Sequence, residues 1–584
     1  MTRIHDDPED FADDQFAGWL GLYADRIRGV HGGAVSLRTD GAAPQVAVVI
    51  GGGSGHYPAF CGTVGPGFAT GAVVGNVFTS PSAAQAYSVA KAADQGRGVV
   101  FSFGNYAGDT MNFGLAAERL RAEGIDTRIV VVTDDIASAE DETKRRGIAG
   151  DFSVFKALGA AAAEGLDLDE VERIGNACNH ATRTLGVAFS GCTMPGAHEP
   201  LFTVPEGHLG LGLGIHGEPG IEDVPMLRAR DLADLFVDRL LADRPANAGT
   251  RVAPILNGLG DTKYEELFLL WGRIAARLAD AGIDTVEPEV GEIVTSLDMG
   301  GCSLTLQWLD DELERLWRAD AYTPAYRKVA APVGALVPST AEQTADGEAT
   351  APDATDAARR AARTARAVLA AMHDLLREQE ETLGRIDAVA GDGDHGRGML
   401  KGIGAAVQRV DRIGQEGGVA FVLGRAGDAW AEYAGGTSGV LWGAALESFG
   451  RALGDDSDEY TAQDVADAAA AFAEAIVHLG GAKRGDKTLL DALLPFVDEL
   501  QQRVGRGEDL PTAWTGAAAI ATREAEATSD LRPRVGRARP LAEKSVGTPD
   551  AGATSMGMIL TVIGAVLSAR ADSTAAATPE GMNA

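Results

Sequence analysis

Short apolar runs alternate with helical patterns in the first part of the chain. The run VAVVI (46–50) is typical of a buried strand, and similar runs occur at 98–103 and 129–132. Helical patterns lie among them, for example at 115–123 and 154–165. Strands that alternate with helices predict a parallel or mixed sheet with helices on its faces.

A second α/β unit is expected from about residue 184, and a surface helix is expected before the first strand. That helix would span residues 11–30, because Phe11, Phe16 and Leu20 recur there at near-helical spacing. The second unit contains GVAFSGCTMPG (186–196), a glycine-rich stretch at 209–220, VAPILNGLG (252–260) and SLDMGGCSLTLQWLD (296–310).

The pattern changes after residue 330, which is where we place the end of the first domain (1–330). Residues 331–357 are rich in Ala, Pro, Thr and acidic residues and have no apolar period, which predicts a linker. An all-α domain is expected over 358–571, followed by a disordered tail at 572–584. Its predicted helices are 358–383, 401–411, 418–433, 461–479, 488–503, 512–528 and 551–570.

Composition narrows the class of protein. A chain of 584 residues predicts two to four domains, and the formal charge of −33 argues against nucleic acid or an anionic membrane as a partner. The acidic N-terminus does not resemble a signal peptide. The apolar run from Met556 to Leu567 is too short to span a bilayer and is expected to form a buried helix. The four cysteines contain no CxxC pair, so neither a zinc ribbon nor a disulfide framework is indicated. These features predict a soluble cytoplasmic protein.

The stretch DAVAGDGDHGRG (387–398) carries the clearest candidate chemistry. Asp387, Asp392 and Asp394 lie within eight residues, and such carboxylates repel one another unless a cation or protons intervene. The glycines leave backbone N–H groups free for phosphate oxygens. An EF-hand is excluded because the twelfth position, counted from Asp392, is Ile403. We predict a magnesium–phosphate site, with a solvated turn as the alternative.

Other polar loops accompany it in the helical part. AGGTSG (434–439) offers the hydroxyls of Thr437 and Ser438 among glycines, and GRARP (536–540) offers Arg537. GGAKRGDKT (480–488) is not a Walker A site, because Asp486 interrupts the required GK[ST]. Each loop alone is as consistent with an ordinary turn as with phosphate binding.

Three polar residues of the first domain follow glycine-rich turns. GLGIHG (212–217) matches G-x-G-x-x-G literally, but Glu-Pro-Gly follows it and no helix can begin there, so a dinucleotide fingerprint is excluded. His216 remains either a structural residue or a nucleophile. His56 and Asp109 follow strand ends and are candidates for hydrogen bonding and general-base work on a hydroxyl.

Taken together, these motifs resemble those of the fused, ATP-dependent dihydroxyacetone kinases. The resemblance covers nearly the whole chain, and it implies an α/β N-terminal substrate domain of two lobes and an all-α C-terminal nucleotide domain, an eight-helix barrel. The family usually forms homodimers. The matching segments are GGGSGHYPAF (51–60), GNYAGDTMNFG (104–114), GLGLGIHGEPGI (210–221), NGLGDT (257–262), GDGDHGRGM (391–399), GGTSG (435–439), GGAKRGDKTLLDALLP (480–495) and SVGTPDAGATS (545–555).

The resemblance also implies roles for individual residues. His216 would add to the carbonyl of a small ketose and give a hemiaminal, and Asp109 would take the proton from the terminal hydroxyl that attacks the γ-phosphorus of ATP. Gly53, Ser54, Gly55 and His56 would line the substrate. Asp387, Asp392 and Asp394 would bind Mg²⁺. The nucleotide would be surrounded by His395, Gly396, Arg397, Gly398, Thr437, Ser438, Gly480, Leu489, Arg537, Asp550, Ala551 and Gly552.

One departure from the family concerns the choice of sugar. Members often have a lysine where this chain has Gly104. Its loss removes a donor to the substrate and is expected to open space, which favours erythrulose, with dihydroxyacetone as the alternative. A kinase that depends on a phosphotransferase system and a sugar-binding regulator are less favoured, because both domains are fused and the three aspartates, His216 and Asp109 are intact. We also predict that the two halves of the site meet between domains, of one chain or of two.

Overall fold

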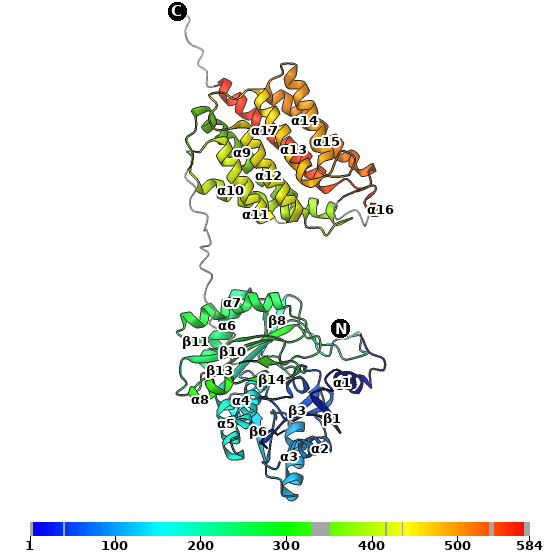
Figure 1. Cartoon of the computed structure of the whole chain (residues 1–584), viewed down its shortest axis with the longest axis vertical. Helices are drawn as coiled ribbons and strands as arrows, with labels where there is room; N and C mark the ends of the chain where they lie inside the picture. The colour runs from blue at the N-terminus through cyan, green and yellow to red at the C-terminus, as the bar shows by residue number, and fades with distance from the viewer. Residues whose placement is uncertain are drawn as a thin grey trace, which may run out of the picture. The chain divides into compact units, whose positions relative to one another are not determined.

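The computed structural model describes residues 4–38, 41–329, 351–414, 417–434, 436–535 and 542–576. They belong to two compact units, residues 1–337 and 338–584 (Figure 1). The first unit is α/β and the second is helical, so the predicted fold class is confirmed.

The first lobe of the N-terminal unit is built on a six-stranded mixed sheet in the order β1-β2-β4-β3-β5-β6. Strands β4, β3, β5 and β6 are parallel, and β1 and β2 add an antiparallel edge. The elements are α1 (Phe11–Leu22), β1 (Ile27–Val30), β2 (Gly33–Ser36), β3 (Ala47–Ser54), β4 (Gly71–Val77), α2 (Ala83–Ala93), β5 (Val99–Gly104), α3 (Ala107–Ala122), β6 (Thr127–Val132), α4 (Asp151–Ala163) and α5 (Leu168–His180).

Both faces of this sheet are covered, as its continuous apolar strands require. Alternate residues of β3 point to opposite sides. Ala47 and Val49 join the cluster of α2 and α3, whereas Val48 and Ile50 join that of α4 and α5. Figure 1 shows β3 and β6 between these two pairs of helices.

The single helix expected over residues 11–30 is wrong in its second half. Helix α1 ends at Leu22, and residues 27–30 form strand β1. Ile27 and Val30 are β-branched and pair with β2 across a hairpin, with Val30 opposite Gly33. The near-helical spacing of aromatic residues ends at Tyr23, so it did not extend to this strand.

The second lobe has a seven-stranded sheet in which β10, β13 and β7 are neighbours and antiparallel. Helices α6 and α7 cover one face, and Ala253 and Ile255 on the other face join the core of the first lobe. The elements are β7 (Thr182–Ala188), β8 (His208–Leu211), β9 (Glu222–Pro225), α6 (Ala229–Ala242), β10 (Arg251–Gly258), α7 (Tyr264–Asp280), β11 (Asp284–Thr285), β12 (Glu289–Gly291), β13 (Gly301–Trp308), α8 (Asp311–Arg318), β14 (Ala321–Tyr322) and β15 (Arg327–Lys328).

The C-terminal unit has eight long helices around one apolar core, within the part that the structure describes. The sequence pattern missed α12, because glycines at its start and at Gly443 weaken the helical signal. A Cβ at Gly443 would lie 2.7 Å from the carbonyl oxygen of Gly427, so close helix packing requires this glycine. The helices are α9 (Asp356–Asp387), α10 (His395–Arg412), α11 (Val419–Ala434), α12 (Gly436–Leu453), α13 (Ala462–Gly480), α14 (Leu490–Gly505), α15 (Leu510–Ala527), a short α16 (Ala542–Ser545) and α17 (Ala551–Ala576).

Helix α17 contains the one described stretch, Ala551–Ala571, that is long and apolar enough to cross a membrane by length and composition alone. The expectation that the apolar run is too short is therefore wrong, because the run extends beyond Met556–Leu567. The helix packs against α15 and α9, and Met556, Ile559 and Leu560 are buried in the barrel core. This packing is that of a core helix in a helical domain.

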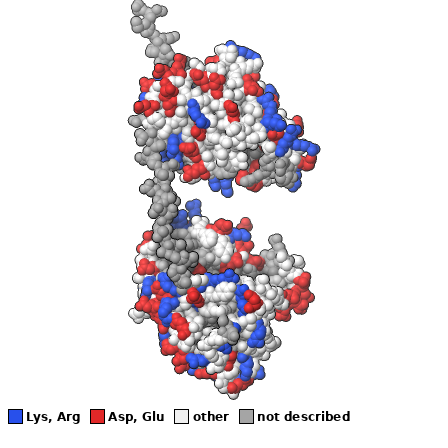
Figure 2. Space-filling view, viewed as in Figure 1, with Lys and Arg blue, Asp and Glu red and all other residues white. Residues whose placement is uncertain are grey.

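The surface carries charges of both signs, and the four cysteines lie in the interior. Acidic and basic side chains both occur on the visible face of each unit, and basic side chains gather along the right edge of the helical unit (Figure 2). The four cysteines are all unpaired and buried, and burial raises the pKa of Cys61, Cys178 and Cys302 to about 12. Their thiols therefore stay protonated and unreactive at neutral pH.

Candidate active site

A cavity of about 220 Å³ lies in the first unit, where the carboxyl ends of parallel strands β3 and β5 meet. This edge is where α/β sheets place ligands. Four of the predicted residues line it, namely Gly53, His56, Asp109 and His216. The other lining residues are Gly51, Gly52, Phe60, Phe78, Ser80, Gly104, Tyr106, Gly147, Asp151, Ile215 and Val294.

Ser54 and Gly55 form the turn between Gly53 and His56 but do not line the cavity. Gly55 has φ +99°, and a Cβ there would lie 2.8 Å from the ring of Phe78, so the turn requires glycine. A Cβ at Gly53 would lie 2.7 Å from the backbone nitrogen of Thr79. The glycine-rich segment therefore lets the backbone pass close to its neighbours and sets the direction of His56.

His56 is a buried, neutral imidazole with a defined tautomer. Its Nδ1 lies 2.7 Å from the carbonyl oxygen of Thr295, which can only accept, so Nδ1 carries the proton. Burial, with the nearby His216, lowers the pKa of His56 to about 3. The Nε2 of His56 is then an acceptor, and it lies 3.0 Å from the Nε2 of His216.

His216 is held between two acceptors. Its Nδ1 lies 2.9 Å from Oε1 of Glu218, and its backbone N–H donates to Oε2 of the same carboxylate. Burial opposes the charge on Glu218, but the hydrogen bonds from His216 outweigh it and lower the pKa of Glu218 to about 2. A proton on each nitrogen of His216 satisfies both contacts. Departure of the Nε2 proton toward His56 would expose the lone pair to the cavity.

Asp109 lies in the first turn of α3 and is 7% exposed. Burial raises its pKa to about 6, although Ser80 and His216 partly oppose the shift. Its Oδ1 has no hydrogen-bond partner among the described residues. A carboxylate poised near neutrality with a free oxygen is a competent general base for a hydroxyl.

Gly104 ends β5 and lines the same cavity, but its position is not an open space. A Cβ there would lie 3.0 Å from the carbonyl oxygen of Gly147 and 3.1 Å from the ring of Tyr106. The backbone of Gly147 thus occupies part of the volume that the missing side chain was expected to free. The lining at this point still lacks a lysine amino group.

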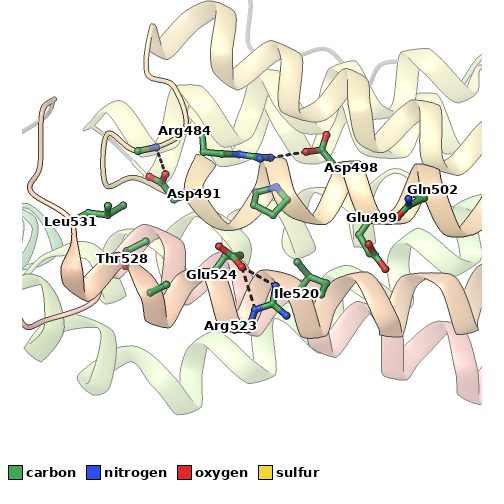
Figure 3. Close-up of a pocket in the computed structure, with 13 residues that line it drawn as sticks. Arg484, Asp491, Asp498, Glu499, Gln502, Ile520, Arg523, Glu524, Thr528 and Leu531 are labelled. Carbon is green, nitrogen blue, oxygen red and sulfur yellow. Dashed lines mark hydrogen bonds and ion pairs between the residues drawn. The ribbon is translucent and has the colours of Figure 1, made fainter.

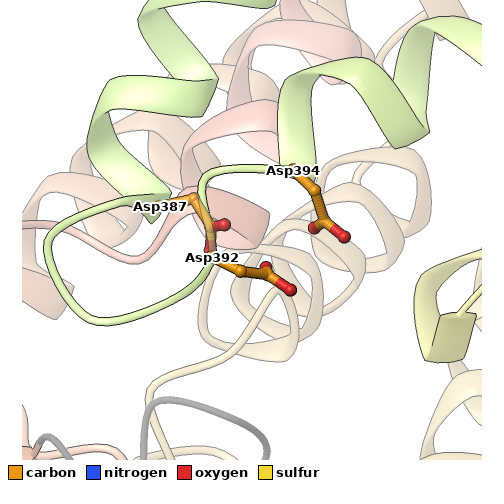
Figure 4. Close-up of side chains that lie close together, drawn as sticks. All are labelled: Asp387, Asp392 and Asp394. Carbon is orange, nitrogen blue, oxygen red and sulfur yellow. The ribbon is translucent and has the colours of Figure 1, made fainter. Parts of the chain in front are cut away.

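In the second unit, the three predicted aspartates lie close together. One carboxylate oxygen from each of Asp387, Asp392 and Asp394 lies within 4.8 Å of the others, and Figure 4 shows them around the turn between α9 and α10. Gly393 (φ +76°) donates its N–H to Oδ2 of Asp387 at 2.8 Å, and a Cβ at Gly391 would lie 2.5 Å from Oδ1 of Asp387. Three convergent carboxylates fit a hard divalent cation.

The other predicted nucleotide-site residues lie mostly at helix N-termini. His395, Gly396, Arg397 and Gly398 begin α10, Thr437 and Ser438 begin α12, and Leu489 and Asp550 precede α14 and α17. Helix N-termini offer unpaired N–H groups and a positive dipole end to phosphate. Ala551 and Gly552 begin α17, and Gly480 ends α13.

Two contacts bring some of these helix ends together. The Nε2 of His395 lies 3.0 Å from the hydroxyl of Ser555, which joins α10 to α17. A Cβ at Gly552 would lie 3.4 Å from the Cβ of Leu489, which places α17 beside α14. Arg537, predicted to contact the nucleotide, lies outside the described residues.

A larger groove of about 620 Å³ lies between α14 and α15 and does not include the aspartates (Figure 3). Its cationic side chains are paired with acids: Arg484 with Asp498, and Arg523 with Glu524. Because these positive charges are neutralised, we do not assign a phosphate to this groove.

Several residues with a defined structural or chemical role were not predicted from the sequence. Glu218 lies two residues after His216, and this spacing was the available signal for it. Tyr106 and Asp151 carry no local signal, because only the fold brings them to the cavity. Lys487 is buried, and its Nζ donates to the carbonyl oxygens of Leu531, Ser545 and Thr548 at 3.1, 2.7 and 2.8 Å.

Comparison with known proteins gives matches along the whole chain. Residues 17–325 match the Dak1 domain and residues 389–565 match the DAK2 domain. The chain is 57% identical to a D-erythrulose kinase of Mycolicibacterium smegmatis over 96% of its length and 97% of that protein. It is 51% identical to an L-erythrulose kinase of Pectobacterium atrosepticum, over 98% of each.

A solved structure agrees over the full length as well. The dihydroxyacetone kinase of C. freundii in complex with AMP-PNP and Mg²⁺ is 27% identical, with a TM-score of 0.58, and the match covers 97% of this chain and 99% of that one.

Proposed function

The chain belongs to the dihydroxyacetone kinase family and is a ketose kinase, and from this premise we propose that it phosphorylates erythrulose with ATP. The observation that best supports a ketose substrate is the position of His216. Its Nε2 lies beside a second histidine, at a small cavity that is also lined by a buried carboxyl. Two full-length relatives, 57% and 51% identical, act on erythrulose by name, and this favours the four-carbon sugar.

We propose that capture of the sugar proceeds by addition of His216 to the carbonyl carbon. The Nε2–C bond forms as the C=O π bond breaks, and the proton that leaves Nε2 passes by way of His56 to the carbonyl oxygen, giving a hemiaminal hydroxyl. Glu218 stabilises the positive charge that remains on the ring. Polyols such as glycerol have no carbonyl and would not be captured.

In the proposed transfer, Asp109 accepts the proton of the terminal hydroxyl as its oxygen attacks the γ-phosphorus of ATP. The chain's contribution is to fix the sugar by a covalent bond and to orient one hydroxyl toward a base, which lowers the entropic cost of reaction. Asp387, Asp392 and Asp394 would hold Mg²⁺, which neutralises phosphate charge when bound. The nucleotide would lie against the N-termini of α10, α12, α14 and α17.

Dihydroxyacetone is the second candidate substrate. The full-length similarity to the C. freundii dihydroxyacetone kinase favours it. The cavity chemistry supports both sugars, because both carry a ketone beside a primary hydroxyl.

A substrate panel tests the proposal. The purified chain is assayed with ATP and Mg²⁺ against D-erythrulose, L-erythrulose, dihydroxyacetone and glycerol, and products are identified by NMR. We expect the highest kcat/KM with one erythrulose enantiomer and no turnover of glycerol. A clear preference for dihydroxyacetone would contradict the assignment of erythrulose, and turnover of glycerol would contradict capture at a carbonyl.

A further inference from the structure

A buried carboxyl without a partner lines the ketose cavity and has no part in the proposed chemistry. Asp151 is the first residue of α4 and is 3% exposed, and its Oδ1 has no hydrogen-bond partner among the described residues. A buried polar atom left unpaired costs about 1–3 kcal/mol. Because Asp151 lines the cavity, a partner on the ligand explains its unpaired oxygen most simply.

The surroundings of Asp151 favour the protonated, neutral form of its carboxyl group. Burial raises the pKa of Asp151 well above its ordinary value, and repulsion from Asp134 and Asp109 acts in the same direction. A protonated carboxyl both donates and accepts a hydrogen bond, which matches the two capacities of a sugar hydroxyl.

The carboxyl lies where the backbones of Gly104 and Gly147 approach each other. A Cβ built on Gly147 would lie 2.4 Å from the Cα of Gly104 and 2.9 Å from Oδ1 of Asp151. The close approach of the two glycines thus leaves the Asp151 carboxyl as the polar group at this part of the lining. The hydroxyl of Tyr106 is also buried without a partner among the described residues, and its ring packs edge-on against His216.

A purely structural role for Asp151 at the start of α4 explains its burial and its unpaired oxygen less well than ligand binding does. An aspartate in the first turn stabilises a helix through its negative charge, and burial disfavours that charge here. Ser153, two residues on, also has a buried hydroxyl without a partner among the described residues, but it does not line the cavity. Ser153 therefore provides a matched control on the same helix.

We infer that Asp151 is a specificity-determining residue that binds the additional hydroxyl of a four-carbon ketose. The inference rests on the proposed function. His216 fixes the carbonyl carbon and Asp109 takes one terminal hydroxyl, so the longer arm of erythrulose supplies a hydroxyl that dihydroxyacetone lacks. A site built to bond a hydroxyl discriminates strongly against the analogue without it, because its own polar group stays unpaired.

The test compares kcat/KM for erythrulose and dihydroxyacetone in the wild type and in Asp151→Ala, Asp151→Asn and Ser153→Ala. Asp151→Ala is expected to lower kcat/KM for the preferred erythrulose enantiomer about 10- to 100-fold, the range of one lost hydrogen bond to a buried polar group. Turnover of dihydroxyacetone should change less than about threefold. The amide of Asp151→Asn donates and accepts, so this variant should keep most of the preference, and Ser153→Ala should keep all of it.

The outcomes separate the inference from the function on which it rests. If the wild type does not phosphorylate erythrulose, the proposed function fails. If the wild type prefers erythrulose and Asp151→Ala lowers kcat/KM for both sugars equally, or for neither, the function stands and the role of Asp151 is overturned. ¹³C NMR of carbonyl-labelled erythrulose with Asp151→Ala adds a second readout: the hemiaminal should still form but at higher sugar concentration.

Discussion

At the scale of single residues, similar groups acquire different roles because their partners differ. His56 and His216 are both imidazoles, but a carbonyl oxygen fixes one as a neutral acceptor and a carboxylate supports charge on the other. Glu218 and Asp109 are both carboxyls, the first partly buried and the second buried. Hydrogen bonds lower the pKa of the first and burial raises that of the second. These environments support the roles that we propose for the four residues: His56 as proton acceptor, His216 as nucleophile, Glu218 as counter-ion and Asp109 as base.

The pKa of Asp109 predicts the acid limb of the pH–rate profile. Its folded value is raised from 3.8 to about 6, so the carboxylate that accepts a proton is present above pH 6 and is lost as the pH falls. We expect kcat/KM for the ketose to fall below pH 6, approaching tenfold per pH unit. An ordinary aspartate, with a pKa near 4, would keep most of the activity down to about pH 5.

The control for this profile is Asp109→Asn, whose residual rate should lack the inflection near pH 6. Capture of carbonyl-labelled ketose by this variant, followed by ¹³C NMR, should persist. A wild-type profile that stays flat to pH 5 would show that Asp109 is not the base.

At this scale, site residues that follow strand ends could be predicted from the sequence. Residues that the fold brings to the cavity from other segments could not. His56, Asp109 and His216 lie in glycine-rich segments, where the local pattern marks a turn at a strand end. Asp151 opens a helix whose other residues are nearly all buried, and nothing in its neighbourhood distinguishes it from an ordinary first-turn acid. Its importance comes from the approach of Gly147 to Gly104, a contact between segments distant in the sequence.

At the scale of elements, the C-terminal unit carries its three candidate metal ligands around the turn between two helices. The turn from α9 to α10 is compact because glycines occupy positions that a side chain would disrupt. The helical spacing of apolar residues was sufficient to predict seven of the long helices, although the start of α10 was placed at residue 401 and lies at His395. It could not predict α12, whose glycine-rich start looks like a loop until it packs against α11.

The aspartate turn gives a prediction about magnesium. In Gly391→Ala the new methyl group would meet Oδ1 of Asp387 at 2.5 Å and displace that carboxylate. We expect the Mg²⁺ concentration for half-maximal activity to rise about 10-fold or more, as for other changes that misorient metal ligands. Gly404→Ala in α10 is the matched control, because its Cβ meets only ordinary contacts with His373. Unchanged magnesium dependence in Gly391→Ala would argue against metal binding here.

Lys487 joins the segments that precede α14 and α17. Its amino group donates to three backbone carbonyls, and Lys487→Met would leave all three without this donor. We expect the unfolding free energy of the C-terminal unit to fall by about 1–3 kcal/mol, the cost of one unpaired buried group, because only the contact with Ser545 is fully buried. Thermal unfolding measures the loss. Lys483→Met, at an exposed position of the same loop, should change stability little, and equal Tm values for both variants would contradict this role.

At the scale of the whole molecule, the chain consists of two units with separate cores. The apolar clusters of the first unit draw on residues 19–321, and the cluster of the second draws on residues 362–560. The two candidate sites are divided in the same way, with the ketose cavity in one unit and the three aspartates in the other. That the two halves of the site meet between domains stays a prediction.

Separate cores predict two calorimetric unfolding transitions, each responding to one ligand. A ligand at 100 times its Kd stabilises the unit that binds it by about 2.7 kcal/mol. Erythrulose should therefore raise one Tm, and a non-hydrolysable ATP analogue with Mg²⁺ should raise the other. His216→Ala should remove only the response to sugar, and Asp392→Ala only the response to nucleotide. One transition that responds to both ligands would contradict the assignment of a site to each unit.

Because all four native cysteines are buried, a cysteine introduced on the surface can be labelled without first removing them. Because their thiols are enclosed and protonated, a maleimide dye added to the native protein should leave them unmodified. A cysteine introduced on the surface of each unit would then be the site that takes the dye. A donor and an acceptor attached in this way would follow the separation of the two units during turnover by single-molecule fluorescence.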